Sequence, residues 1–149
     1  MQFIGHLSTS DRERLMAEGA VLRLHEGDHL LRRGARGGDI YLVETGSLEV
    51  VDIRQSPEII LEILGPGRIV GEMGFVDQAP RSADVRALEE STVRHWTHEI
   101  LTRVLDGDPA LSSRFFHALS NAAVSRIRST NPASITRSAH AITSVGGIS

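Results

Sequence analysis

The sequence predicts an α+β fold, in which an eight-stranded antiparallel β jelly roll (a double-stranded β-helix) is flanked by one N-terminal helix and two C-terminal helices. Two observations predict this fold. Eight short β-type runs separated by turn signals fill residues 20–96, and this rhythm is typical of closed or double-sheet β units. Helix start signals precede that stretch, and apolar residues at helical spacing follow it. The 149 residues suffice for one domain with one core.

The first helix is expected over residues 8–18. Ser8 or Ser10 can cap it, and Asp11 lies in its first turn. The strands are expected at the runs that follow, because they are rich in β-branched or other apolar residues and are separated by turn signals such as EGD, GARGGD, TG, QSP and GPG. These runs are AVLRLH, HLLRR, IYLVE, SLEVVDI, EIILEIL, RIV, ADVRAL and STVRHW.

Two further helices are expected after Trp96. The run THEILTRVL predicts the first, which ends at DGDP, and Pro109 fits the first turn of the second with Asp108 as its cap. The second helix keeps an apolar stripe to about residue 130, and that stripe can pack against the β unit, form a dimer seam or cover a pocket. Its residues are Leu111, Phe115, Leu119, Ala122, Ala123 and Ile127.

The remaining residues, 131–149, are rich in Ser, Ala, Thr and Gly and show no clear period. They are expected to form a flexible C-terminal tail or linker. The domain is therefore expected to span residues 1–130.

The composition excludes several classes of function. The net charge is −3, so no global field attracts nucleic acid. The chain has no cysteine, which excludes disulfides and thiolate metal sites and favours a reducing compartment such as the cytoplasm. All 16 basic residues are arginine, which excludes lysine-based chemistry. No apolar run approaches the ~18 residues that a membrane span needs.

The histidines do not predict a metal site. His25 and His29 are four residues apart, but the GD sequence between them is typical of a turn. His95 and His98 lie where a strand is expected to end and a helix to begin. The His-x-His pair and following glutamate of the cupin metalloenzymes, which share the jelly-roll architecture, are missing. No serine, histidine and acid arrangement indicates catalysis, so neither an enzyme nor a cofactor is expected.

The stretch GEMGFVDQAPRSA, residues 71–83, places a carboxylate and a guanidinium at the two ends of a loop. Glu72 follows a glycine, and Arg81 comes nine positions later. The two side chains could form a surface ion pair, which would be worth ~0–1 kcal/mol. They could also hold two different parts of one ligand.

With its neighbours, this stretch resembles the phosphate-binding cassette of the cyclic nucleotide-binding domain family. That cassette has a glycine–glutamate pair, a loop with a short helix, then arginine, a small residue and alanine. The runs LHEGDHLLRRGARGGDIYLVETGSLEV and LGPGRIVGEMG look like the family's earlier strands and turns. The resemblance extends from about residue 3 to residue 130, and it implies a cyclic purine mononucleotide, cAMP or cGMP, as the ligand.

The resemblance also implies a role for each cassette residue. Arg81 would bind the exocyclic oxygens of the cyclic phosphate through two parallel hydrogen bonds. Glu72 would accept a hydrogen bond from the ribose 2′-hydroxyl, and Gly74 would let the backbone approach the ligand. Ser82 can supply a hydroxyl to the phosphate or the base. The expected ligand-binding residues are Gly71, Glu72, Met73, Gly74, Arg81, Ser82 and Ala83, with Val50 and Leu61 on the base-facing wall.

Some of these assignments have alternatives. Val50 and Leu61 could be plain core residues. In one branch of the family the end of the last helix contacts the base, which would place Thr130 and Asn131 there. Ser82 does not distinguish cAMP from cGMP, and a cyclic dinucleotide occurs in some relatives.

The resemblance implies a sensor without catalysis. The ligand phosphate would draw the cassette inward, and a hinge before Leu111 would let the last helix report occupancy to a second subunit or to a fused or separate effector. The chain is expected to be a stand-alone sensor or a fragment of a regulator, channel or transporter. One alternative is a domain that has lost its ligand and serves as a dimerisation or docking module. The other is a cupin-like metalloenzyme.

Overall fold

The computed structural model describes residues 3–129 of the chain. The expected contacts of Thr130 and Asn131 and the expected tail over residues 131–149 lie outside the described residues.

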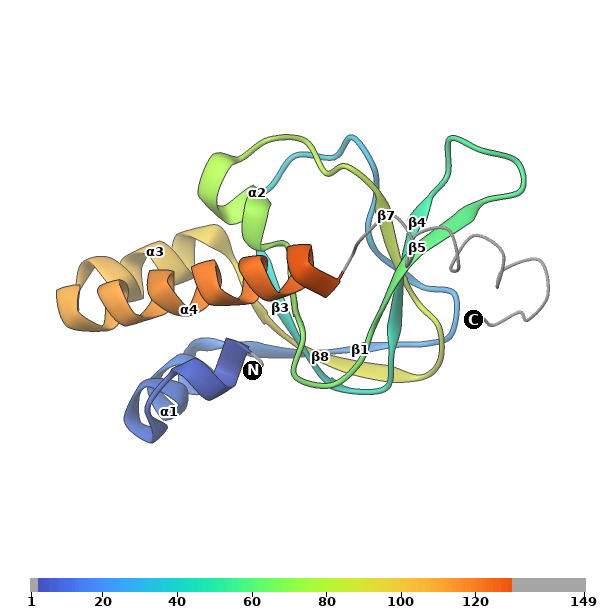
Figure 1. Ribbon diagram of the computed structural model, residues 1–149. Helices are drawn as coiled ribbons and strands as arrows, with labels where there is room; N and C mark the ends of the chain where they lie inside the picture. Colours follow the sequence, from blue (N-terminus) through green and yellow to red (C-terminus); the bar gives the residue numbers. More distant parts are fainter. Residues whose placement is uncertain (1–2, 130–149) are drawn as a thin grey trace.

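All eight expected strands are present, in two four-stranded antiparallel sheets, so the predicted fold class is confirmed (Figure 1). One sheet has the order β1-β8-β3-β6 and the other β2-β7-β4-β5. Both sheets combine early and late strands, which is the connectivity of a jelly roll. The strands are β1 (Ala20–Leu24), β2 (His29–Leu31), β3 (Ile40–Thr45), β4 (Leu48–Asp52), β5 (Ile59–Leu64), β6 (Ile69–Val70), β7 (Asp84–Ala87) and β8 (Ser91–Trp96).

The helices gather at one end of the β unit (Figure 1). The expected caps are confirmed, because Ser8 Oγ accepts from the Asp11 N–H at 3.1 Å and Asp108 Oδ1 accepts from the Leu111 N–H at 3.1 Å. The short η1 was not expected, since four residues carry too little periodicity. The helices are η1 (Phe3–His6), α1 (Thr9–Glu18), α2 (Glu72–Asp77), α3 (His98–Asp106) and α4 (Pro109–Ser129).

The core consists of two clusters of buried apolar residues. One lies between the two sheets, with Leu48 and Val93 at its centre. The other joins the helices to sheet β1-β8-β3-β6. The α4 stripe belongs to this second cluster, since Leu111, Phe115 and Leu119 are buried in it. Packing is therefore the role of these three stripe residues. Ala122 packs against the same cluster, while the side chains of Ala123 and Ile127 lie outside the described part.

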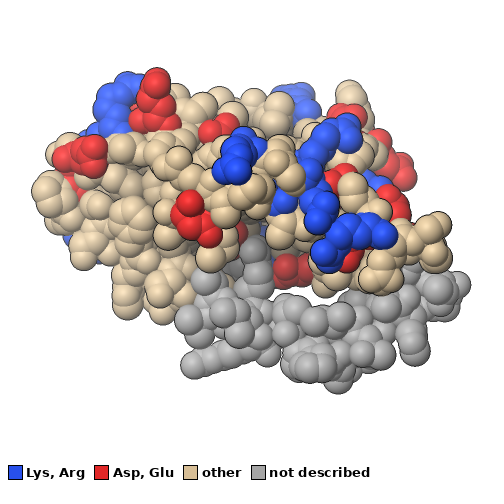
Figure 2. All heavy atoms as spheres, turned by 90° about the horizontal axis from the view of Figure 1, so that it is seen from above, with Lys and Arg blue, Asp and Glu red and all other residues tan. Residues whose placement is uncertain are grey.

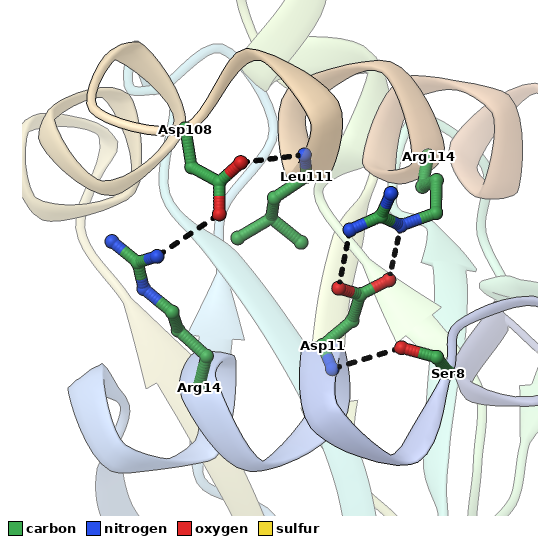
Figure 3. Close-up of polar contacts among 6 residues, drawn as sticks. All are labelled: Ser8, Asp11, Arg14, Asp108, Leu111 and Arg114. Carbon is green, nitrogen blue, oxygen red and sulfur yellow. Dashed lines mark hydrogen bonds and ion pairs between the residues drawn. The ribbon is translucent and has the colours of Figure 1, made fainter.

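Two ion pairs attach the start of α4 to α1 (Figure 3). Arg114 donates two hydrogen bonds to the carboxylate of Asp11, at 2.6 and 2.8 Å. Arg14 donates to Asp108 Oδ2 at 3.0 Å, next to the cap of α4. The hydrogen bond from Arg114 lowers the pKa of Asp11 below its ordinary value, although burial of the carboxylate acts in the opposite direction. These pairs hold α1 and the first turns of α4 together.

Replacing Asp11 by asparagine is expected to lower stability in a pH-dependent way. Because the folded-state pKa of Asp11 is lowered, its contribution is complete above the unfolded-state pKa and disappears as pH falls through the folded-state value. We expect a loss of about 1–2 kcal/mol at pH 7, since Arg114 is half exposed. The loss should shrink below about pH 4. Urea unfolding of native protein and Asp11→Asn from pH 7 to pH 3 measures this.

Glu13→Gln is the control for this measurement, because Glu13 lies exposed on the same helix. It should change stability by less than about 0.5 kcal/mol at any of these pH values. A difference between the native protein and Asp11→Asn that stays constant down to pH 3 would contradict the assignment.

Candidate functional site

A cavity of about 320 Å³ lies between α2 with its following loop and the sheet β2-β7-β4-β5. This volume lies at the lower end of the range of ligand pockets in proteins, roughly 300–1,000 Å³. The cavity brings together every residue expected to bind ligand except Leu61. Those that line it are Val50, Gly71, Glu72, Met73, Gly74, Arg81, Ser82 and Ala83.

The cassette begins with a sharp turn at the end of β6. Gly71 has a φ of +89°, in the left-handed region, and α2 starts at the next residue. A Cβ on Gly71 would lie 2.6 Å from the backbone oxygen of Asp39. Glycine is therefore required here by both the dihedral angle and the close approach of another backbone segment.

Arg81 is fixed at both its backbone and its side chain. Its N–H donates to the carbonyl of Ala35 at 2.8 Å, and its carbonyl accepts from the Gly34 N–H at 2.7 Å. The guanidinium donates to the carbonyl oxygens of Gly71 at 3.2 Å and Asp39 at 3.1 Å. Both acceptors are neutral, and the guanidinium borders the cavity. The arginine is thus held at the site by partners weaker than an anion.

Gly74 has a role that the sequence did not indicate. A Cβ at this position would lie 2.3 Å from Nη1 of Arg81 and 2.9 Å from the Gly37 carbonyl oxygen. The missing side chain therefore makes room for the Arg81 guanidinium itself. The expectation that Gly74 lets the backbone approach a ligand remains a prediction.

Exposure differs among the other cassette residues. Glu72 is buried, with 4% of its surface exposed, although it lies in the first turn of α2 on the cavity wall. Ala83 is also buried, whereas Met73 is 58% exposed and Ser82 is exposed. A buried carboxylate and a fixed guanidinium therefore border one cavity.

The sheet contributes a row of four side chains to the opposite wall. Leu31 on β2 pairs with Val85 on β7, Val85 pairs with Val50 on β4, and Val50 pairs with Glu62 on β5. All four residues line the cavity. The wall is therefore apolar along β2, β7 and β4 and acidic on β5, the edge strand next to β4.

Leu61, expected on this wall, is not among the described residues that line the cavity. The register between β4 and β5 shifts there, because Val50 pairs with Glu62 while Val51 pairs with Ile60. Leu61 is thus the extra residue of a bulge, and its neighbour Glu62 takes the place on the wall. The signal that could have indicated Glu62 is its single acidic side chain within the apolar run IILEIL.

Glu62 forms an ion pair with Arg68, which precedes β6. The two side chains are 19% and 27% exposed, so both are largely shielded from solvent. The arginine balances the charge of a carboxylate that an apolar wall would otherwise disfavour.

Phe75 links the cassette to the C-terminal helices. It is a buried residue of α2, and its ring lies 5.1 Å from that of His98 and 6.0 Å from those of Phe115 and Phe116. Asp39 adds a second link. Its backbone oxygen binds Arg81, and its carboxylate accepts from the N–H of His98 at 3.1 Å. Neither Phe75 nor Asp39 was expected at the site from the sequence.

The four histidines considered as metal ligands lie on separate elements. His25, His29 and His95 contact the carboxylates of Glu90, Asp84 and Asp39 respectively. Within residues 3–129, no group of three or more His, Asp or Glu side chains could hold a metal ion. Nor does any helix in that part of the chain combine the length and apolar character needed to cross a bilayer.

The face that carries α2 shows mixed charge. In Figure 2, basic side chains lie beside acidic ones over much of this face. Ion pairs among the described residues include Arg54 with Asp52 and Arg86 with both Glu49 and Glu58. This face therefore lacks the single-sign field that nucleic acid binding uses.

Comparisons with known proteins agree with this geometry. A family model described as "cyclic nucleotide-binding domain" matches residues 21–108. A solved cyclic nucleotide-binding domain from Methylobacillus flagellatus is 25% identical with a TM-score of 0.77, over 83% of this chain and 70% of the other.

Two curated relatives are much longer than the matched stretch. An uncharacterised ABC transporter ATP-binding protein of Mycobacterium tuberculosis is 34% identical over 52% of this chain and 24% of its own length. A cAMP-dependent protein kinase regulatory subunit of Debaryomyces hansenii is 28% identical over 60% of this chain and 19% of its own length. The family model covers more than half of the chain and includes the whole cassette, so this chain belongs to the cyclic nucleotide-binding domain family.

Proposed function

We propose that this chain is a non-catalytic sensor that binds a cyclic purine mononucleotide, cAMP or cGMP, and reports its occupancy through α4. The observation that carries the proposal is the position of Arg81. Its guanidinium is held at the cavity by two neutral carbonyls, which a phosphate can replace with stronger, charge-assisted hydrogen bonds.

Glu72 supports the choice of a ribonucleotide. Its carboxylate is buried on the cavity wall that also carries Arg81. A buried carboxylate there is a strong acceptor for a hydroxyl, and the ribose 2′-hydroxyl is the donor that the family resemblance implies. The apolar row on the sheet, which includes Val50 and Val85, offers a surface for a purine base.

The contacts of Phe75 and Asp39 support a relay. A phosphate that draws Arg81 away from the carbonyl oxygens of Gly71 and Asp39 would move α2, which begins next to Gly71. It would also move Asp39, whose carboxylate binds the first N–H of α3 at His98. Phe75 would pass the movement to Phe115 on α4. Because two ion pairs attach the start of α4 to α1, these helices would move together about the expected hinge before Leu111.

The relatives support a class of effector for this proposal. The relatives named above include an uncharacterised ABC transporter ATP-binding protein and a kinase regulatory subunit, which supports a regulatory role within or beside a larger protein. We place the chain in the cytoplasm, where a chain without cysteine fits a reducing environment. Dimerisation through α4 is part of the same proposal.

Calorimetric titration of the ligand-free protein tests the proposal. We expect saturable one-site binding of cAMP or cGMP and no comparable binding of 5′-AMP, which lacks the cyclic ester. Removing the ribose hydroxyl, as in 2′-deoxy-cAMP, should weaken binding of the adenine nucleotide about tenfold or more, because one hydrogen bond to a carboxylate is lost. In Glu72→Gln the same removal should cost much less, and an equal loss in both proteins would mean that Glu72 does not contact this hydroxyl.

The result that overturns the proposal is the absence of binding heat with either cyclic nucleotide in protein shown to be folded. That outcome would favour the docking or dimerisation module. If nucleotide binds, hydrogen exchange of the α3 and α4 amides with and without ligand tests the relay, which predicts changed protection in both helices.

A further inference from the structure

We infer that Glu62 is a specificity-determining residue that makes the site prefer guanine over adenine, so that the natural ligand is a cyclic guanine nucleotide. The inference rests on the proposed function. It starts from the acidic end of the row on the sheet, where Glu62 follows Leu31, Val85 and Val50. A polar side chain on a largely apolar wall can be one of the few groups that fix the orientation of a ligand.

The sheet register places Glu62 where a base edge can reach it. Arg81 comes just before β7, and its backbone bonds to the segment that follows β2. Glu62 lies on β5, two strands beyond β7 in the order β2-β7-β4-β5. Two strand spacings amount to about 10 Å, which is comparable to the length of a mononucleotide. A nucleotide with its phosphate on Arg81 can thus lie along the row with its base toward Glu62.

Guanine and adenine present different groups to a carboxylate. The Watson–Crick edge of guanine has two adjacent donors, N1–H and the N2 amino group, which match the two oxygens of one carboxylate. The corresponding edge of adenine has one donor, the N6 amino group, beside the N1 acceptor. An ionised carboxylate accepts hydrogen bonds but cannot donate them. It therefore pairs with guanine and repels N1 of adenine.

The ion pair with Arg68 is compatible with this role. A carboxylate has about four lone-pair sites, so Glu62 can accept from Arg68 and from a base together. Arg68 also positions the carboxylate, because it holds Glu62 from the segment before β6. Together the pair presents an oriented acceptor at the end of the cavity wall.

The test compares cGMP, cAMP and cIMP on the native protein and on Glu62→Gln by calorimetry. The inosine nucleotide keeps N1–H but lacks the N2 amino group. We expect native protein to bind cGMP about tenfold or more tighter than cAMP, with cIMP between them. Because an amide presents one donor group and one acceptor group side by side, Glu62→Gln should lose most of this preference and bind cAMP at least as well as native protein does.

Glu44→Gln is a matched control. Glu44 pairs with Arg94, and these side chains are 25% and 24% exposed, close to the values for Glu62 and Arg68. Glu44 lies on β3 in the other sheet and is not among the described residues that line the cavity. Its replacement leaves an arginine unpaired in the same way, so the order of the three ligands should stay unchanged.

The outcomes separate this inference from the proposed function. Equal or tighter binding of cAMP by native protein, or an equal loss for all three nucleotides in Glu62→Gln, overturns the inference and leaves the sensor in place. Binding of no cyclic nucleotide overturns both. A preference for cGMP that Glu62→Gln removes and Glu44→Gln retains supports the assignment.

Discussion

Replacing Arg81 by alanine is expected to weaken cyclic nucleotide binding by a factor of about 100 or more. The variant loses the two charge-assisted hydrogen bonds proposed for the phosphate, worth roughly 3–6 kcal/mol together. Each 1.4 kcal/mol corresponds to about a tenfold change in the dissociation constant. Arg81→Lys should lie between native protein and Arg81→Ala, because lysine keeps the charge but lacks the planar fork. Titration calorimetry measures the three dissociation constants.

Two controls separate the loss of a phosphate contact from other effects. Arg32 is an exposed arginine on the neighbouring loop and is not among the described residues lining this cavity. Arg32→Ala should therefore change affinity by only a fewfold, through the local field. Urea unfolding of Arg81→Ala reports the loss of the bonds to Gly71 and Asp39. Native affinity in a folded Arg81→Ala would show that the phosphate binds elsewhere.

Local signals made most of the fold predictable from the sequence. The strands are short apolar runs, most of them separated by turn residues, and both expected helix caps follow from a single serine or aspartate beside an apolar stripe. The cassette was also recognisable, because the order of its glycines, Glu72 and Arg81 is carried by one continuous segment. The strands, the helix caps and the cassette could therefore be predicted, because each depends on residues that are close together in the sequence.

Features that depend on contacts between distant segments could not be predicted. The bulge in β5 exchanges Leu61 for Glu62 on the cavity wall. The lone acidic residue in IILEIL marks Glu62 as unusual, but the strand sequence does not show where its register shifts. Asp39 supports Arg81 through a backbone oxygen, so its residue type says nothing about that contact. Similarly, the close approach of Gly74 to Arg81 arises only when the loop folds back on α2.

The second large effect is expected from Gly71→Ala, which should both destabilise the protein and weaken nucleotide binding. An alanine with a φ near +89° costs roughly 1–2 kcal/mol in backbone strain alone. The added Cβ would also lie 2.6 Å from the Asp39 oxygen and 3.2 Å from Nη1 of Arg81. Relief of this clash must move one of the carbonyls that hold Arg81. We therefore expect affinity to fall about tenfold or more.

Gly27→Ala separates the two causes. Gly27 has nearly the same dihedral angle, with a φ of +90°, but a Cβ there would meet nothing within 4 Å. It should show the strain alone, a loss of roughly 1–2 kcal/mol in urea unfolding with unchanged affinity. Gly71→Ala should lose more stability than this and should lose affinity as well. Equal losses of stability with native affinity in both variants would mean that the backbone contact between Gly71 and Asp39 does not position Arg81. The position of Arg81 would then have to come from the hydrogen bonds of its backbone with Gly34 and Ala35.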